Sequence, residues 1–536
     1  MLSGDARPGQ LGSGYDRYTV PIPPASNSPT IYPQLLCSAM KLLAVLLWLA
    51  TLRPCSGGQT PLSAIRHDAS ASASSANANA PFIFSSVQGL LRQLPNTFSP
   101  NGFSIVAATV PAWTNLYHAR KDAGAIPKVE WVAFDAEMSY GIMGGRRGET
   151  WLHTFVTTRD VRVLVFDGMS AALRTSGTLD SQSVFLDGAG DGGPPLLGEY
   201  ARATALCEWA RGVAGAEIEG FVRMNTGFEM IWCDFEASAS WRRVSKLNVT
   251  ARDGARPPSP PGDGRGLPWA GAAGWEWIRS ATWHYARPES RVVPDLCRFF
   301  TFYDTGYASF PRGLRGPRDS SHRLVNVTAP DAAAFRARIG RSLGSRSPCS
   351  GFDWRRVAHD VVDRYGGRIR ELQLVLAANA TDAAKDAGRL AFAAVMPFVS
   401  DSRRAGALRR CALAHTGAVP QDALSPQEAL IRSAVETVVT RICATFLRVY
   451  FGYLRGAAAD EIGAWRAEVD GLVAWLDWDV WRTCEPSCAR NEVCAGALWP
   501  MLGRLDAEEW SRPRCVNSSV VEHGRSGGRR DARIAV

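Results

Sequence analysis

Three short segments of the chain carry the side chains best suited to chemistry. They contribute a histidine, a tyrosine and a glutamate in that order, His118, Tyr140 and Glu229, each next to strand-like apolar sequence. In the last segment, strand alternation puts Glu229 on the same face as Ile231 and Cys233. A carboxylate on an apolar face is costly unless it is paired or lies at a functional site. The pattern therefore predicts either a structural pairing or a catalytic role for Glu229.

The residues around these three resemble a known signature. Leu116–His118, then Ala133–Asp135 with Ser139–Tyr140, then Glu229–Asp234 follow the order found in ADP-ribosyltransferases of the His-Tyr-Glu type, the diphtheria-toxin and poly(ADP-ribose) polymerase branch. The resemblance implies a split-sheet α+β core. It also implies that NAD is the substrate, and that the reaction is transfer of ADP-ribose or hydrolysis of NAD.

In that resemblance each residue has a role toward NAD. His118 would hydrogen-bond a ribose, Tyr140 would stack on the nicotinamide ring, and backbone groups at Ala119 would hold the carboxamide. Glu229 would stabilise the oxocarbenium-like state formed as the nicotinamide–ribose bond breaks. The sequence departs from the family at Ala119, where the family has glycine, and at Met230, where it has an aromatic residue.

Other interpretations of the same residues stay open. His118 is also typical of a structural histidine at a strand end, and Tyr140 of a core tyrosine. The protein would then be a non-catalytic secreted or cell-surface protein on a degenerate scaffold. A third interpretation is a carbohydrate-active enzyme that uses Asp135 with Glu137, or Asp234 with Glu236, as its two carboxylates. The sequence has no His-Glu-x-x-His, Walker loop or Cys-x-x-Cys motif, and it predicts no metal site.

Apolar spacing predicts the elements that position these residues. Between 86 and 252, short strand-like runs alternate with turns and with one helix-like stretch, Leu197–Val213, which predicts an α+β domain with a dominant sheet. Residues 253–273 are rich in Pro and Gly and predict a linker. Residues 274–515 change to helical spacing and contain most of the cysteines, which predicts a mainly helical, disulfide-stapled region. The predicted strand runs are Ser104–Ala108, Trp131–Phe134, Trp151–Thr157, Val161–Phe166, Glu219–Met224 and Phe228–Phe235.

The residues from Met40 onward predict export. One lysine, an apolar run and a stretch of small residues match the parts of a secretory signal over 40–58. The run is shorter than the ~20 residues that a membrane span needs. Residues 1–39 predict a disordered extension or a start site placed too early, and residues 59–85 predict a low-complexity leader. The basic tail, 516–536, predicts disorder.

Two further patterns predict an extracellular glycoprotein. Acceptor motifs for N-linked glycans occur at Asn248, Asn326, Asn379 and Asn517. Of the 12 cysteines, all but Cys37 and Cys55 follow the predicted signal, and this even number suits an oxidising compartment. The four cysteines nearest the C-terminus predict disulfides rather than a zinc site: Cys484, Cys488, Cys494 and Cys515.

The charge of the chain does not predict a nucleic-acid partner. The formal net charge is +9, but outside the tail the basic residues are scattered. A protein or small molecule that accepts ADP-ribose would be the partner of the transferase interpretation. The runs Thr157–Val161 and Phe166–Ser170 resemble a group of uncharacterised secreted fungal proteins, a resemblance that implies no activity.

Overall fold

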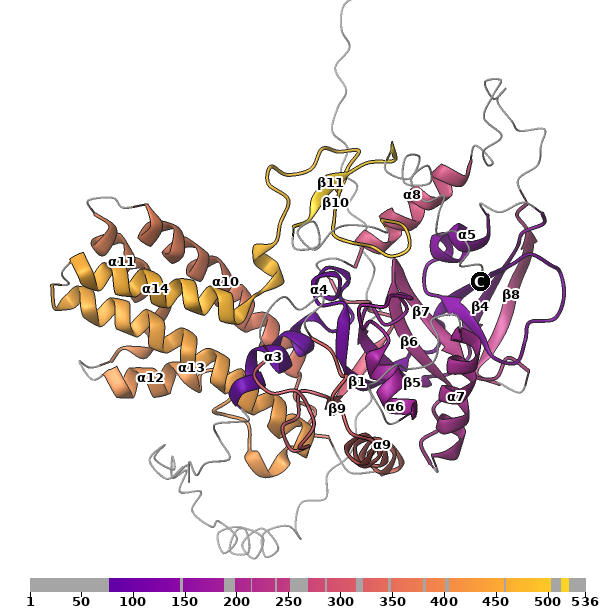
Figure 1. The fold of residues 1–536 in the computed structure, drawn as a ribbon, viewed down its shortest axis with the longest axis horizontal. Coiled ribbons are helices and arrows are strands. Elements are labelled where there is room, and N and C mark those ends of the chain that lie inside the picture. The colour runs from indigo at the N-terminus through magenta and orange to yellow at the C-terminus, as the bar shows by residue number, and fades with distance from the viewer. Residues whose placement is uncertain are drawn as a thin grey trace, which may run out of the picture. The chain divides into compact units, whose positions relative to one another are not determined.

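A nine-stranded sheet is the largest feature of the protein (Figure 1). The computed structural model describes residues 77–144, 148–187, 198–213, 215–236, 239–250, 269–284, 287–314, 322–345, 349–378, 382–400, 404–456, 459–502 and 512–519. The strand order is β8-β4-β2-β3-β7-β6-β5-β1-β9. The strands are β1 (Asn101–Val110), β2 (Asn115–Arg120), β3 (Glu130–Ala133), β4 (Trp151–Thr157), β5 (Val161–Gly168), β6 (Gly220–Asn225), β7 (Gly227–Trp232), β8 (Trp241–Asn248) and β9 (Val293–Thr301).

The sheet is mixed, because one neighbouring pair of strands is parallel. β5 and β6 run parallel, while the other paired strands are antiparallel. Parallel neighbours need a long crossover, and the chain between them contains two helices, α6 (Asp180–Asp187) and α7 (Glu199–Gly212). The predicted α+β class with a dominant sheet is confirmed. A likeness of this sheet to an ADP-ribosyltransferase core stays a prediction.

The sheet curls strongly at the end that holds β8. Trp241 of β8 lies 6.3 Å from Trp232 of β7, measured between ring centroids. In a flat sheet these strands, four places apart in the order, would be separated by roughly 19 Å. The curled strands therefore enclose aromatic side chains on their concave face. These strands are β8, β4, β2, β3 and β7.

The remaining helices divide into those near the sheet and those of the C-terminal region. The first group is α3 (Ala80–Gly89), α4 (Gln93–Phe98), α5 (Ala136–Gly144), α8 (Trp269–Thr282) and α9 (Ala329–Gly344). The second group is α10 (Trp354–Ala377), α11 (Ala383–Val395), α12 (Arg404–Ala412), α13 (Pro426–Leu454) and α14 (Ala459–Leu476). Short 3₁₀ turns are η2 (Asn77–Asn79), η4 (Met396–Phe398), η5 (Gln421–Ala423) and η6 (Asp479–Trp481), and a small hairpin is made by β10 (Val493–Ala495) and β11 (Arg514–Val516).

The longest helix, α13, begins at a strong capping sequence. The Ser425 hydroxyl accepts the Glu428 amide at 3.1 Å, and the Glu428 carboxylate accepts the Ser425 amide at 2.9 Å. With Pro426 in the first turn, this capping box satisfies amides that a helix start otherwise leaves unpaired. One face of the helix is then buried through Ile431, Val438 and residues that follow at helical spacing.

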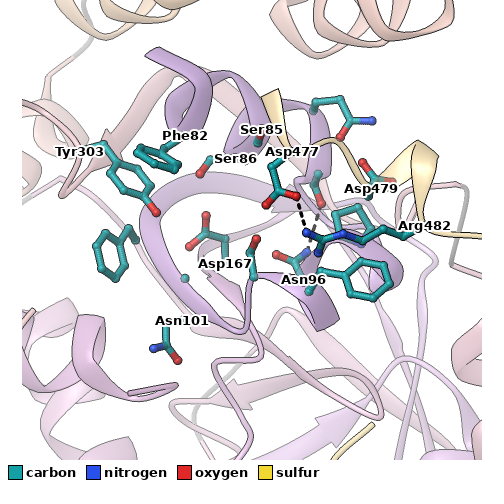
Figure 2. Close-up of a pocket in the computed structure, with 17 residues that line it drawn as sticks. Phe82, Ser85, Ser86, Asn96, Asn101, Asp167, Tyr303, Asp477, Asp479 and Arg482 are labelled. Atoms are coloured by element: carbon teal, nitrogen blue, oxygen red, sulfur yellow. Dashed lines mark hydrogen bonds and ion pairs between the residues drawn. The ribbon is translucent and has the colours of Figure 1, made fainter. Parts of the chain in front are cut away.

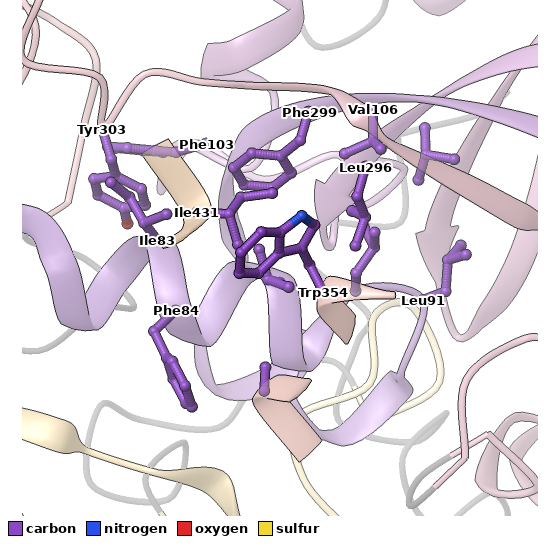
Figure 3. Close-up of a cluster of buried hydrophobic side chains, with 14 of the residues drawn as sticks. Ile83, Phe84, Leu91, Phe103, Val106, Leu296, Phe299, Tyr303, Trp354 and Ile431 are labelled. Carbon is purple, nitrogen blue, oxygen red and sulfur yellow. The ribbon is translucent and has the colours of Figure 1, made fainter. Parts of the chain in front are cut away.

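The sheet and the C-terminal helices share one hydrophobic core. β9 lies beyond the predicted linker 253–273, yet it pairs with β1. Figure 3 shows Phe299 of β9, Trp354 of α10 and Ile431 of α13 in one buried cluster. α3, which begins inside the predicted leader 59–85, also contributes Ile83 and Phe84 to this cluster (Figure 3).

All ten cysteines that follow the predicted signal are paired in disulfides. The pairs are Cys207–Cys233, Cys297–Cys349, Cys411–Cys443, Cys484–Cys494 and Cys488–Cys515. The prediction of disulfides for the C-terminal four is confirmed. The structure also supplies their connectivity, which the spacing alone left open.

Among the described residues, no helix combines the length and apolar character that crossing a bilayer requires. The predicted secretory signal, 40–58, and the predicted tail beyond Ser519 lie outside the described residues.

Candidate functional site

His118 lies in the interior of β2 and is 7% exposed. Its Nδ1 lies 2.7 Å from the Trp131 carbonyl oxygen, so the neutral ring donates from that nitrogen. Burial lowers the pKa of His118 to about 4. The neighbouring rings belong to His153 and Phe235, with centroids 6.2 and 6.3 Å away. His118 is therefore a neutral side chain within a mainly aromatic interior.

Glu229 lies in β7 and is 7% exposed. Its Oε1 accepts a hydrogen bond of 2.7 Å from the Arg223 guanidinium on the neighbouring strand β6. Arg223 also pairs with Glu199 of α7 and reaches the Gln182 side chain of α6 at 3.1 Å. Burial raises the pKa of the Glu229 carboxyl, an effect that Arg223 opposes and the nearby Glu199 reinforces. The Glu229 carboxylate is thus held in an ionic cluster under two helices.

Strand register places His118 and Glu229 on opposite faces of the sheet. Glu229 lies opposite Ala133 of β3, and Ala133 lies opposite Tyr117 of β2. Residues directly opposite share a face and consecutive residues alternate, so Tyr117 shares the face of Glu229 and His118 does not. We name these two sides the Glu229 face and the His118 face.

Ala119 and Tyr140, the other two predicted NAD-binding residues, do not connect the Glu229 face with the His118 face. Ala119 is a buried β2 residue that lies opposite Leu152 of β4. Tyr140 is half-buried on α5, a helix whose Ser139 hydroxyl donates to the Tyr117 carbonyl at 2.8 Å. Among the described residues, the Tyr140 hydroxyl makes no hydrogen bond to His118 or Glu229. His118 and Glu229 cannot line one nucleotide cleft from opposite faces.

Arg223 is a site residue that the sequence interpretation missed, although a signal for it was present. β6 and β7 form a hairpin in which Asn225 pairs with Gly227, whose φ is +118°. Arg223 and Glu229 are each three residues from Thr226 at the centre of this turn. Residues equidistant from a hairpin turn lie opposite each other, so the hairpin predicts the pair that neutralises Glu229.

The other carboxylates considered for a carbohydrate-active enzyme lie in different surroundings. Asp234 pairs with Lys128 at 3.3 Å and caps a turn at the Glu236 amide. Asp135 is buried and pairs with Arg291 at 2.7 Å. Neither pair of carboxylates forms an isolated acid and base across a cleft.

A small polar cavity lies where the end of β5 meets α3 and the 477–482 segment. Figure 2 shows the Asp167 carboxylate below Ser86 of α3 and Asp477, with Arg482 paired to Asp477. The Asp167 Oδ1 accepts the Ser104 amide at 2.7 Å. Burial raises the pKa of Asp167 to about 7, although Ser104 and Ser86 donate to it. The cavity volume of about 40 Å³ has room for a few water molecules, but not for a nucleotide or a sugar.

Three of the four predicted glycan acceptors belong to the described residues. Asn248, at the end of the edge strand β8, and Asn326 are exposed, and Asn517 is half-buried. The Asn248 side-chain oxygen accepts the Thr250 amide at 3.0 Å. Asn379 lies outside the described residues. These positions leave the prediction of glycosylation open to experiment.

Comparisons with known proteins link the chain to uncharacterised fungal proteins. A family model described as the YPL277C N-terminal domain matches residues 74–151 and 142–256. The uncharacterised protein YOR389W of Saccharomyces cerevisiae is 28% identical over 205 residues, which cover 30% of this chain and 32% of that protein. The uncharacterised protein YPL277C of the same yeast is 28% identical over 206 residues, or 30% of this chain and 41% of that protein.

The chain therefore spans well under half of the length of these relatives. The matched residues include most of the sheet, from α3 to β8, and all four residues of the predicted NAD site. No solved structure matches the chain. The expected similarity to uncharacterised fungal proteins is confirmed, and the comparisons add no activity.

Proposed function

We propose that this protein is an exported glycoprotein that works by binding carbohydrate, and that it does not consume NAD. The proposal joins the non-catalytic interpretation of the sheet with the part of the carbohydrate interpretation that the geometry favours. One observation carries it: Trp113 is held 68% exposed on a strained turn.

The turn at Trp113 holds the indole ring rigid and exposed, so that a ligand ring can stack on it. Trp113 has a φ of +67°, in the left-handed region, which costs a residue other than glycine about 1–3 kcal/mol. The turn is fixed by backbone bonds, since the Trp113 amide donates to the Thr157 carbonyl at 2.9 Å. The Arg242 guanidinium of β8 lies over the indole ring, 5.9 Å from the ring centroid. A rigid, exposed indole close to a cation suits a sugar ring and its hydroxyl groups.

The disulfide pattern supports export. Ten cysteines that are all paired are typical of proteins that mature in oxidising compartments. The exposed Asn248 and Asn326 acceptors are in positions that a glycosylating enzyme can reach. Both features lie on the part of the chain that follows the predicted signal.

Two observations argue against consumption of NAD. The carboxylate that catalysis would need, Glu229, is already committed to Arg223 in a closed ionic cluster. The imidazole that would hold the ribose, His118, points to the opposite face with a carbonyl already bound to its Nδ1.

A polysaccharide pull-down tests the binding role. Secreted full-length protein would be incubated with insoluble β-glucan or chitin, and the bound fraction measured. We expect Trp113→Ala to weaken binding at least about fivefold, because stacking alone contributes about 1 kcal/mol and the lost buried area adds to it. Trp283→Ala is the matched control, since Trp283 is 58% exposed on a different element. Equal binding by wild type and Trp113→Ala, or no binding to either polymer, contradicts the proposal.

An NAD assay tests the excluded chemistry. Nicotinamide release would be measured for the wild type and for Glu229→Gln at matched amounts of folded protein. We expect no turnover above the buffer rate for either. Turnover by the wild type that Glu229→Gln abolishes would restore the transferase interpretation. Mass spectrometry of the secreted chain would separately give its N-terminus and the occupancy of Asn248.

A further inference from the structure

A compact polar cluster lies where the chain leaves β3, away from the Trp113 turn. It consists of Asp135, which directly precedes α5, His284, which follows α8, and Glu289 and Arg291, which precede β9. Asp135 is 5% exposed and Glu289 is fully buried. These residues come from two parts of the chain about 150 residues apart, which the fold brings together.

The three potential ligand atoms have the spacing of a metal site. The His284 Nε2 lies 3.4 Å from the Asp135 Oδ2 and 3.2 Å from the Glu289 Oε2. Nitrogen–oxygen hydrogen bonds are usually near 2.9 Å. In a tetrahedral zinc site with bonds of about 2.05 Å, neighbouring ligand atoms are about 3.3 Å apart. The two separations from the His284 Nε2 match edges of such a tetrahedron, and the three atoms all lie within 4.8 Å of one another.

Two of these atoms, the Asp135 Oδ2 and the His284 Nε2, face each other at 3.4 Å but make no hydrogen bond of good geometry within the described part of the chain, and both are buried from solvent. A buried polar atom without a partner is costly. Both atoms point toward the same space, so one cation placed there would satisfy them together.

The surrounding contacts hold the three side chains in place. Arg291 donates from Nη2 to the Asp135 Oδ1 at 2.7 Å, and from Nε to the Glu289 Oε1 at 2.7 Å. Its Nη2 also reaches the Glu289 Oε2 at 2.7 Å. The His284 ring packs edge-on against Phe228, with centroids 5.7 Å apart. Groups that orient ligands in this way are typical of metal sites.

We propose that Asp135, His284 and Glu289 bind one divalent transition-metal ion, with zinc as the best candidate. One imidazole nitrogen and two carboxylate oxygens form a set that zinc accepts readily, and three protein ligands leave a fourth position for water. Calcium and magnesium prefer sites made of oxygen alone. With Arg291 beside two carboxylates and a divalent ion, the cluster carries one net positive charge, so the fourth position favours hydroxide or another anion.

The alternative to a bound metal ion is a proton on His284. A protonated His284 would pair with Asp135 and Glu289 and balance the charges without a metal. The two arrangements differ in a measurable way, because only one of them takes up zinc at neutral pH and loses it to a chelator.

Zinc titration of the full secreted chain tests the proposal. Protein stripped with chelator would be titrated with zinc by calorimetry at pH 7, and native mass spectrometry would count bound ions. We expect one equivalent of zinc, a rise in the thermal midpoint that EDTA reverses, and no comparable effect of magnesium. His284→Ala and Asp135→Asn should each weaken binding at least about tenfold.

The matched control is His415→Ala, because His415 is a half-buried histidine on a different part of the chain. It should bind zinc as the wild type does. Absence of zinc uptake by the folded wild type, or unchanged affinity in both His284→Ala and Asp135→Asn, would overturn the proposal. Should either variant fail to fold, the stoichiometry and chelator reversal of the wild type still decide the outcome.

Discussion

The two faces of the sheet at β2, β3 and β7 solve the problem of burial in different ways. On the Glu229 face, charged side chains are buried against α6 and α7, and each needs a partner of opposite charge. On the His118 face, neutral rings pack together. The ring centroid of Phe155 lies 4.5 Å from that of Trp241 and 5.6 Å from that of Phe235. Residues can follow the chain order of a known signature and still not share a site. Consecutive residues of a strand point to opposite faces, and here one face is ionic and the other aromatic.

The largest effect should come from removing the shared cation of the Glu229 face. Arg223→Met leaves Glu229 buried without its guanidinium, while the half-buried Glu199 keeps its pair with Arg202, and breaking such a buried pair costs about 3–5 kcal/mol. Chemical denaturation followed by circular dichroism measures the loss. The double variant Arg223→Met with Glu229→Gln should recover part of it. A loss below about 1 kcal/mol in the single variant contradicts the cluster as described.

Truncation on the His118 face should cost about as much. Phe155→Ala removes a ring that packs against Phe235 and Trp241, and a buried Phe→Ala change costs about 3–5 kcal/mol. Since no charge is involved, the loss should stay the same between pH 6 and pH 9, in contrast to that of Arg223→Met. A loss that varies strongly over this range would break the comparison between the two faces.

The buried His118 should make the free energy of unfolding fall as the pH is lowered. Because burial lowers the pKa of His118 to about 4 from its ordinary 6.5, the unfolded chain takes up the proton first as the pH falls. The contribution of His118 to stability is therefore lost between about pH 6.5 and pH 4, by about 2 kcal/mol from pH 7.5 to pH 5. Denaturation curves of wild type and His118→Phe at both pH values measure this, and the variant should lose correspondingly less. Parallel losses in both proteins would place the effect elsewhere.

Asp167 and Glu229 are both buried acids, but they have different hydrogen-bond donors. Glu229 is bound by a charged guanidinium, whereas Asp167 is bound by neutral amide and hydroxyl groups. Burial raises the pKa of Asp167 to about 7, so its contribution runs opposite to that of His118: stability falls as the pH rises from about 4 through 7. Asp167→Asn should therefore gain about 1–2 kcal/mol relative to the wild type when both are moved from pH 6 to pH 8. A constant difference between the two proteins would show that Asp167 stays ionised.

Much of the fold could be predicted from periodicity, and the misses have physical reasons. The six predicted strand runs correspond to β1, β3, β4, β5, β6 and β7, because each has an apolar face. β8 has mostly exposed or half-exposed residues, so it lacks a clear apolar run, and β9 lies beyond a stretch that predicted a linker. The first six residues of α3 fall within the predicted leader 59–85, because they continue a sequence of small and polar residues.

The candidate site was harder to predict than the fold. Within β7, alternation predicted that Glu229 is either paired or at a functional site, and the hairpin spacing identifies Arg223 as its partner. The relation of Glu229 to His118 depends on how β2, β3 and β7 are aligned, which no single strand contains. The Asp135, His284 and Glu289 cluster joins residues about 150 positions apart, and no local pattern connects them.

The exposed position of β8 gives the sugar chain predicted at Asn248 a protective consequence. A strand at the rim of a sheet offers its unpaired amides and carbonyls to any passing extended chain, and so seeds aggregation. β8 has exposed Val244 and Leu247, which add hydrophobic attraction to that risk. A bulky hydrated glycan at the end of the strand would act as a steric guard, keeping neighbouring molecules from adding their own strands while the protein folds and travels.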